Sequence, residues 1–252
     1  MESLSSRQNK IIGHIRKLGT DRAYRYCCGE AVCDGLKLLR EAIMWNMKIG
    51  VVLWNGEAQI ELPADVKQYC VPAELLDYAS PLKNSSGPLF TFSMPTWPID
   101  KPGKCLVLET IQDPGNLGTV LRTANALGMD SVILTGECAD IYNPKTIRAT
   151  MGAVFRQRVL SMGREDLREY LSRHGIKLYG AALSEKSRDI RSIELSDAAV
   201  AIGSEGKGLS EEFLKLCDGQ LIIPMSKSCE SLNAGVAAAI VMWELTRGRS
   251  EL

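Results

Sequence analysis

The chain has 252 residues, of which 45% are hydrophobic and 24% charged, the composition of a globular protein with an apolar core. Lysine plus arginine equals aspartate plus glutamate at 30 each, so the net charge neither indicates nor excludes binding to nucleic acid. No stretch approaches the roughly 20 apolar residues of a membrane span, and the N-terminus lacks the apolar core of a signal peptide. We therefore expect a cytoplasmic protein, built as one large domain or, in better agreement with common domain sizes, as a small domain joined to one of about 150 residues.

The N-terminal part of the chain predicts alternating helices and strands. Hydrophobic spacing indicates helices over 8–18, 35–47 and 72–80, and strands over 49–54, 68–71 and 88–94. The segment that follows, 94–104, holds three prolines and a glycine, which is typical of a linker. We therefore expect a first domain over 1–95, a linker over 96–104 and a second domain over 105–252.

The second domain has a more regular pattern. Strands are predicted over 105–110, 131–136, 155–160, 176–183, 198–203 and 221–225, and helices over 116–128, 143–153, 165–175, 210–217 and 231–245. Strands that alternate with helices predict an α/β fold with a mostly parallel sheet covered on both faces. Ligands of such sheets bind beyond the carboxyl ends of the strands.

Two basic stretches are candidate nucleic-acid surfaces. Between Arg7 and Arg25 there are six basic residues against one acid, a pattern suited to phosphate contacts but equally consistent with a solvated helix face. A second run extends from Lys145 to Arg158. The candidate RNA-binding residues are Arg7, Lys10, Arg16, Lys17, Arg22 and Arg148.

The eight cysteines carry no sign of a metal site. They form no C-x-x-C pair, and neither of the two histidines stands at ligand spacing from them. We expect reduced, mostly buried thiols and no bound metal.

Three loops rich in glycine or serine follow apolar strands directly. They are "QDPGNLG" (112–118), "GSEGKGLS" (203–210) and "PMSKSCESLNAG" (224–235). Each alone is best explained as an ordinary turn or helix cap. In a parallel sheet, however, all three would leave at the same edge and converge on one crevice, where helix N-termini offer free backbone N–H groups.

Several familiar chemistries do not fit these loops. The chain lacks G-x-x-x-x-G-K-[ST] and G-x-G-x-x-G, and "GSEGKG" is not a G-x-S-x-G nucleophile elbow. With two histidines in the chain, a Ser-His-Asp triad has few residues to draw on. The site must therefore work with arginine, glutamate, asparagine, serine and backbone groups.

The residues of the three loops resemble the signature motifs of a known family. N-x-G-x-x-x-R (Asn116, Gly118, Arg122), G-S-E-G-x-G (203–208), and I-P-M followed by S-L-N (223–225 and 231–233) are similar to the three motifs of the SpoU/TrmH branch of the SPOUT RNA ribose 2′-O-methyltransferases. The resemblance covers residues 106–245, with the motifs in family order.

The resemblance implies an enzyme that transfers methyl from S-adenosylmethionine to a ribose 2′-hydroxyl. Ribosomal RNA is the expected substrate and transfer RNA the alternative, while a rival hypothesis is a non-catalytic RNA-binding or ribosome-assembly protein of the same fold. It further implies a deep trefoil knot in the second domain, a homodimer, a cofactor held in the knot and an active site near the subunit interface. The first domain is similar to a small α/β fold related to RNA-binding ribosomal proteins.

The family's functional residues fall on particular positions here. The implied catalytic residues are Arg122, Asn116, Glu205, Ser231 and Asn233, and the implied cofactor-binding residues are Leu183, Gly203, Ile223, Leu232 and Asn233. Arg122 would act either as a base or as a group that stabilises an alkoxide and binds the adjacent phosphate. Many relatives carry a serine two residues after the asparagine of S-L-N, whereas this chain has Gly235.

Overall fold

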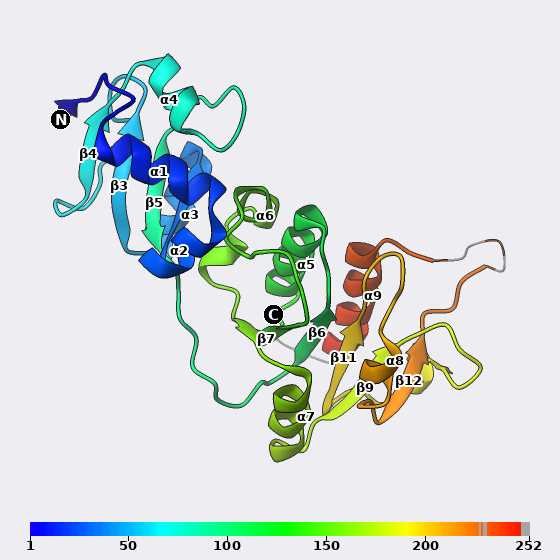
Figure 1. The fold of residues 1–252 in the computed structure, drawn as a ribbon. Helices are drawn as coiled ribbons and strands as arrows, with labels where there is room; N and C mark the ends of the chain where they lie inside the picture. Colours follow the sequence, from blue (N-terminus) through cyan, green and yellow to red (C-terminus); the bar gives the residue numbers. More distant parts are fainter. Residues whose placement is uncertain (227, 229–230, 248–252) are drawn as a thin grey trace. The chain divides into compact units, whose positions relative to one another are not determined.

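A computed structural model describes residues 1–226, 228 and 231–247. The chain forms two compact units (Figure 1). The first combines Met1–Thr96 with Asp140–Arg156, and the second combines Trp97–Ala139 with the chain from Gln157 onward. None of the helices in the described ranges has the length and hydropathy needed to cross a bilayer.

The first unit is built on a mixed sheet. Its strand order is β1-β4-β3-β5-β2; β4 is parallel to β1 and β3, and β5 is antiparallel to β3 and β2. The strands are β1 (Glu2–Ser3), β2 (Glu30–Asp34), β3 (Ile49–Trp54), β4 (Lys67–Cys70) and β5 (Leu89–Ser93). The helices are α1 (Lys10–Thr20), α2 (Arg22–Cys28), α3 (Leu36–Met44), α4 (Ala73–Ala79), α6 (Pro144–Thr150) and the 3-10 turn η1 (Ala153–Phe155).

Helices α1 and α4 cover one face of this sheet. The α1 residues Ile12, Ile15 and Leu18 recur at helical spacing, and all three are buried in one cluster with Leu53 of β3 and Leu76 of α4. Asn9 caps the start of α1, because its side chain accepts the backbone N–H of Ile11. The basic residues of α1 are therefore left on the opposite, solvated side of the helix.

Residues 140–156 complete the core of the first unit. The ring of Phe155 packs edge-on against Phe92 of β5, with centroids 5.1 Å apart. Asp140 is buried and accepts two hydrogen bonds from the buried guanidinium of Arg25, at 3.0 and 2.5 Å. Burial, reinforced by Asp140, raises the pKa of Tyr26 to about 12, so its hydroxyl stays protonated and donates to Asp140. These contacts correct the predicted domains, which assigned 140–156 to the second.

The second unit is built on a parallel sheet, as the sequence predicts. Its order is β10-β12-β9-β11-β6-β7-β8, and every pair of neighbours is parallel. The strands are β6 (Cys105–Glu109), β7 (Ser131–Thr135), β8 (Val159–Ser161), β9 (Lys177–Ala181), β10 (Arg188–Asp189), β11 (Ala198–Ile202) and β12 (Gly219–Ile222). The helices are α5 (Pro114–Ala126), α7 (Arg164–Arg173), α8 (Glu211–Leu214), α9 (Ala234–Thr246) and the 3-10 turn η2 (Ile190–Ser192).

Helices cover both faces of this sheet. Val107 and Ala201 point to the face where Leu167 of α7 and Phe213 of α8 pack in the same cluster. Side chains alternate along a strand, so Leu108 points to the other face, where α9 contacts β11 and α5 contacts β7. Helices α5 and α9 also pack against each other (Figure 1). The confirmed α/β architecture places the carboxyl ends of β6, β11 and β12 at one edge.

Some predicted elements and properties differ from the structure. The strand predicted over 155–160 begins at Val159, because Phe155 ends η1 instead. The short strands β1 and β10, and also α2 and β2, were not predicted. Burial raises the pKa of the Cys105 thiol to about 12, but Cys27 and Cys28 are exposed, so the expectation of mostly buried thiols is wrong for this pair. Cys229 lies outside the described residues.

Candidate active site

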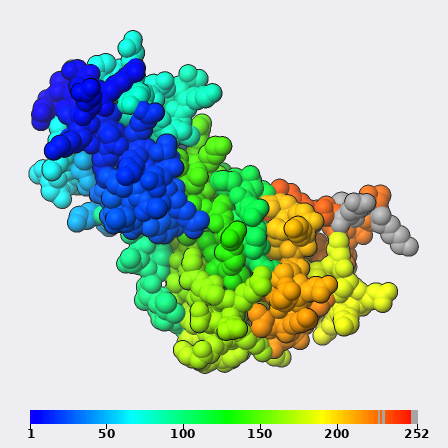
Figure 2. Space-filling model, in the orientation of Figure 1, coloured from blue at the N-terminus to red at the C-terminus, as the bar shows by residue number. Residues whose placement is uncertain are grey.

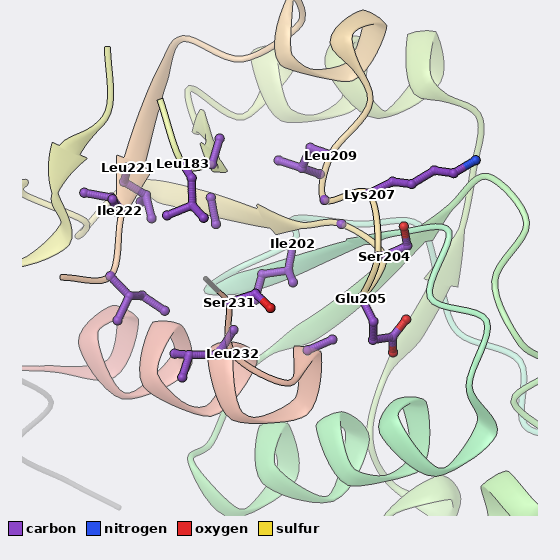
Figure 3. Close-up of a pocket in the computed structure, with 18 of the residues that line it drawn as sticks. Leu183, Ile202, Ser204, Glu205, Lys207, Leu209, Leu221, Ile222, Ser231 and Leu232 are labelled. Carbon is purple, nitrogen blue, oxygen red and sulfur yellow. The ribbon is translucent and has the colours of Figure 1, made fainter. Parts of the chain in front are cut away.

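A pocket of about 510 Å³ opens at the carboxyl edge of the sheet in the second unit. Gly203 after β11 and Ile223 after β12 line it. Leu183 after β9 and Leu232 just before α9 also line it (Figure 3). Glu205 and Ser231 also line it, and Figure 3 shows the side chain of Lys207 extending away from it. The predicted convergence of the strand-end loops is thus observed for the second and third loops at one pocket.

The loop after β11 turns back on itself at Gly203. Ser204 and Gly208 exchange backbone hydrogen bonds of 3.1 and 2.9 Å. A Cβ built on Gly203 would lie 2.0 Å from the carbonyl carbon of Gly208, a contact that no side chain can make. Glycine is therefore required at position 203, because the backbone of this loop folds directly over it.

A buried carboxylate anchors the other end of this loop. Glu109, the last residue of β6, is 1% exposed and accepts hydrogen bonds of 2.8 Å from both the backbone N–H and the hydroxyl of Ser210. Arg164 forms an ion pair of 2.7 Å with the same carboxylate. Ser210 in turn caps α8 by accepting the N–H of Phe213. Glu109 was not among the predicted site residues, although an acid at the end of an apolar strand is a recognisable signal of a buried polar contact.

Asn116 joins the three loops through its side-chain amide. Its Nδ2 donates to Oε1 of Glu205 at 2.6 Å, and its Oδ1 accepts from Nδ2 of Asn233 at 3.0 Å. Asp113 caps α5 at the N–H of Asn116, and Asn233 caps α9 at the N–H groups of Gly235 and Val236. Asn233 therefore both caps α9 and joins the third loop to Asn116.

Gly235 lies beside this polar group. A Cβ at Gly235 would be 3.1 Å from Oδ1 of Asn233 and 3.7 Å from Oδ1 of Asn116. The absence of a side chain at this position lets α9 approach the start of α5 closely. A serine there would add its hydroxyl to an already crowded hydrogen-bond acceptor.

Arg122 lies apart from the hydrogen-bonded group that Asn116, Glu205 and Asn233 form in the same chain. It is exposed on α5 and does not line the pocket. Six residues separate it from Asn116, which on an α-helix corresponds to about 120° around the axis and about 9 Å along it. Within the part of the chain that the structure describes, the side chain of Arg122 has no ion-pair or hydrogen-bond partner. The structure thus gathers Asn116, Glu205 and Asn233 but leaves the guanidinium of Arg122 facing outward.

The pocket suits a cofactor that contains a nucleoside. Its volume lies within the range of about 300–1,000 Å³ typical of ligand sites. Leu183, Ile223 and Leu232 supply apolar walls, and the strand ends supply N–H and C=O groups that can read the edge of a base. The side chains present therefore fit S-adenosylmethionine. Among the described residues, no group of three or more His, Cys, Asp or Glu side chains is arranged to hold a metal ion.

The predicted RNA-binding residues lie in the first unit, whose helices α1 and α2 are coloured blue in Figure 2. The guanidinium groups of Arg7 and Arg16 lie 4.6 and 4.2 Å from the ring centroid of Tyr78. Lys17 lies over Tyr24, and Arg22 over Tyr26. Lys10 and Arg148 are exposed. None of these six cations forms an ion pair with a carboxylate of the described residues.

Comparison with known proteins defines the class of this site. A sequence profile of the SpoU rRNA Methylase family matches residues 103–243, and the chain belongs to this family. The resemblance inferred from the motifs is therefore confirmed, and with it the class of the protein as an RNA methyltransferase.

Two relatives and one solved structure align over nearly the whole chain. The 23S rRNA (guanosine(2553)-2'-O)-methyltransferase RlmP of Bacillus subtilis is 29% identical, covering 97% of this chain and 99% of its own. The 23S rRNA (uridine(2479)-2'-O)-methyltransferase of Streptomyces viridochromogenes is also 29% identical, covering 91% and 86%. The AdoMet-bound rRNA methyltransferase from Sinorhizobium meliloti matches with a TM-score of 0.89 at 26% identity, covering 99% of each chain.

The glycine at 203 gives a test of the pocket. Gly203→Ala places a methyl group against the Gly208 backbone, and a forced backbone shift costs about 1–3 kcal/mol. We expect affinity for S-adenosylmethionine to fall roughly 5- to 150-fold, as measured by calorimetry. Gly13→Ala is the control, because a Cβ there meets nothing within 4 Å and Gly13 is not among the residues that line the pocket, and it should stay within about twofold of wild type. Equal affinities for the two variants would contradict the proposed close packing of this loop.

Proposed function

We propose that this chain transfers the methyl group of S-adenosylmethionine to a ribose 2′-hydroxyl of ribosomal RNA. The observation that carries the proposal is the hydrogen-bonded group of Asn116, Glu205 and Asn233 beside a nucleoside-sized pocket. The names of the Bacillus subtilis and Streptomyces viridochromogenes relatives, both 23S rRNA 2'-O-methyltransferases, support the substrate.

The cofactor would be held by residues that line the pocket. Backbone groups of Gly203 and Ile223 at the strand ends, and of Leu232 before α9, offer hydrogen bonds, and the side chain of Leu183 also lines the pocket. Leu183 is 61% exposed in the structure, so a ligand beneath it would bury apolar surface that now faces water. This arrangement supports all the assigned cofactor contacts except that of Asn233, whose side chain is engaged with Asn116.

The chemistry requires alignment and charge control. S-adenosylmethionine supplies an electrophilic methyl group on a sulfonium centre. The chain must hold the ribose hydroxyl in line with that methyl group and neutralise the proton that the hydroxyl loses. Glu205 and Ser231 offer polar groups that line the pocket. Asn233 is joined to Glu205 through its hydrogen bond to Asn116. Arg122 would stabilise the developing alkoxide and the neighbouring phosphate, or remove the proton.

Arg122 lies away from the polar group of its own chain, and this separation supports a homodimer in which each copy completes the active site of the other. Helix α9 carries an apolar stripe of Val236, Ile240 and Trp243, and the two outer residues are 49% and 63% exposed. Exposed apolar surface at this spacing favours burial against another helix. We propose that a second copy covers this stripe and that the two copies complete each other's active sites. The trefoil knot implied by the family resemblance stays a prediction.

Two alternatives compete with this proposal. A relative of Synechocystis sp., named an uncharacterized tRNA/rRNA methyltransferase, is 30% identical and covers 97% of this chain and 93% of its own, so transfer RNA remains the alternative substrate. A non-catalytic RNA-binding protein is the second alternative. It would have no need of the Asn116 hydrogen bonds that hold Glu205 at the pocket.

The role of Arg122 can be tested by rate measurements. The protein is incubated with methyl-labelled S-adenosylmethionine and with ribosomal or transfer RNA from a strain that lacks the modification. We expect label in ribosomal RNA, and Arg122→Ala should lower the rate by about 10²-fold or more, because the group stabilising the developing charge is lost. Affinity for S-adenosylmethionine should stay within about twofold.

Arg173→Ala is the matched control, since Arg173 is an exposed arginine of the same unit that pairs with Glu169 on α7. An Arg122→Ala rate within threefold of wild type would contradict the catalytic assignment. Label in transfer RNA alone would exchange the proposed substrate for its alternative.

The dimer can be tested at Trp243. Trp243→Glu places a charge in the apolar stripe of α9, and we expect the dimer to dissociate to the 27.6 kDa chain in sedimentation equilibrium. Ile99→Glu serves as control, because Ile99 is 73% exposed in the same unit but lies outside the stripe. A wild-type protein that is monomeric at micromolar concentration would contradict the proposed assembly.

A further inference from the structure

A tryptophan with one covered and one open side stands at the end of α3. Trp45 is 47% exposed, although tryptophan is usually buried for most of its surface. The guanidinium of Arg156 lies over its ring, 4.9 Å from the centroid. Arg156 is itself fixed by hydrogen bonds to Oε2 of Glu41 at 2.8 Å and to the carbonyl of Gly152 at 3.1 Å. The ring is therefore supported by a cation whose position is set by other contacts.

The packing that holds Trp45 in place also involves earlier residues of α3. Leu38 lines a small cavity together with Ile147 of α6, and further along the helix a Cβ at Gly152 would be 3.0 Å from Glu41. Residues 38, 41 and 45 follow helical spacing, so one face of α3 and its end pack against 147–156. Figure 1 shows α3 and α6 as neighbours in the first unit. Trp45 thus stands on packed secondary structure rather than on a loop.

The charge around Trp45 favours an anionic partner. Segments 36–48 and 143–156 contain one acid, Glu41, which is paired with Arg156. Their exposed cations are Lys37, Arg40, Lys48, Lys145 and Arg148. An open aromatic ring among cations is the combination that binds single-stranded nucleic acid, because bases stack on the ring while the cations contact phosphates.

We propose that Trp45 is a stacking site for an unpaired nucleobase of the substrate RNA, and that Arg148, which lines a small cavity together with Leu38 of α3, contacts the phosphate beside that base. This inference rests on the proposed function, and it adds a requirement for an unstacked nucleotide in the substrate. The inference also assigns different roles to two surfaces of the first unit. Tyr78 is covered by two arginines and supports phosphate contacts, whereas Trp45 keeps an open face for a base.

The experiment compares single-stranded with paired RNA. Binding of a single-stranded oligoadenylate and of an RNA duplex of equal length is measured for the full chain and for Trp45→Ala, Trp45→Phe and Met44→Ala. We expect Trp45→Ala to weaken binding of the single strand about tenfold and Trp45→Phe at most about threefold, because a phenyl ring still stacks. Duplex binding should change less than twofold. Met44 is 68% exposed and adjacent but has no ring, so Met44→Ala is the matched control and should bind like wild type.

Two further readouts separate stacking from a structural effect. The single strand should quench tryptophan fluorescence of the wild type, and the quenching should be lost in Trp45→Phe although that variant still binds. Arg148→Ala should reduce the slope of log affinity against log salt by about 1, whereas Trp45→Ala should leave that slope unchanged. Melting temperatures close to that of the wild type show that the variants are folded.

The outcomes distinguish this inference from the proposed function. S-adenosylmethionine binding is measured by calorimetry on the same samples. If the wild type binds both ligands and Trp45→Ala binds the single strand equally well, the stacking site is refuted while the proposed function stands. If Trp45→Ala changes only the oligomeric state, the surface is a protein interface and the inference is again refuted. A wild type that binds neither ligand would refute both.

Discussion

The side-chain amide of Asn116 is the contact on which the proposed site depends. It hydrogen-bonds to Glu205, 89 residues away in the chain, and to Asn233, 117 residues away. A primary amide can donate and accept at once, and here it does both, toward loops that follow two other strands. Replacement by a carboxylate or an alkyl group would leave Glu205 or Asn233 without a partner. The polar side of the pocket therefore depends on one residue of the first loop.

The remaining contacts keep these loops within reach of Asn116. Gly203 lets the second loop fold back on its own backbone, and the buried carboxylate of Glu109 holds the far end of that loop at Ser210. At the end of the third loop, the lack of a side chain at Gly235 lets α9 pack close to the start of α5. Each contact is a close approach or a satisfied buried charge, and both kinds tolerate little change. The pocket is consequently shaped by backbone geometry, while its side chains remain mostly apolar.

Local patterns in the sequence predict most of this arrangement. Alternating strands and helices predict the parallel sheet, and sequence motifs identify Asn116, Glu205 and Asn233 before their contacts are known. Contacts between distant residues could not be predicted in the same way. The pair of Arg25 and Asp140 joins residues 115 apart, so the membership of 140–156 in the first unit has no local signal. The outward position of Arg122 depends on the register of α5. The apolar stripe of α9, on which the proposed dimer rests, also becomes visible only once it is known which residues of that helix are exposed.

The position of the transferred methyl group distinguishes methylation of a ribose from methylation of a base. Ribosomal RNA treated with the protein and labelled S-adenosylmethionine is digested to nucleosides and analysed by mass spectrometry. We predict that the label appears in a single 2′-O-methylnucleoside, and that in the intact RNA the linkage from this nucleotide to the next resists alkali because its 2′-hydroxyl is blocked. Label on a base, or no transfer by a protein that binds the cofactor, would contradict it.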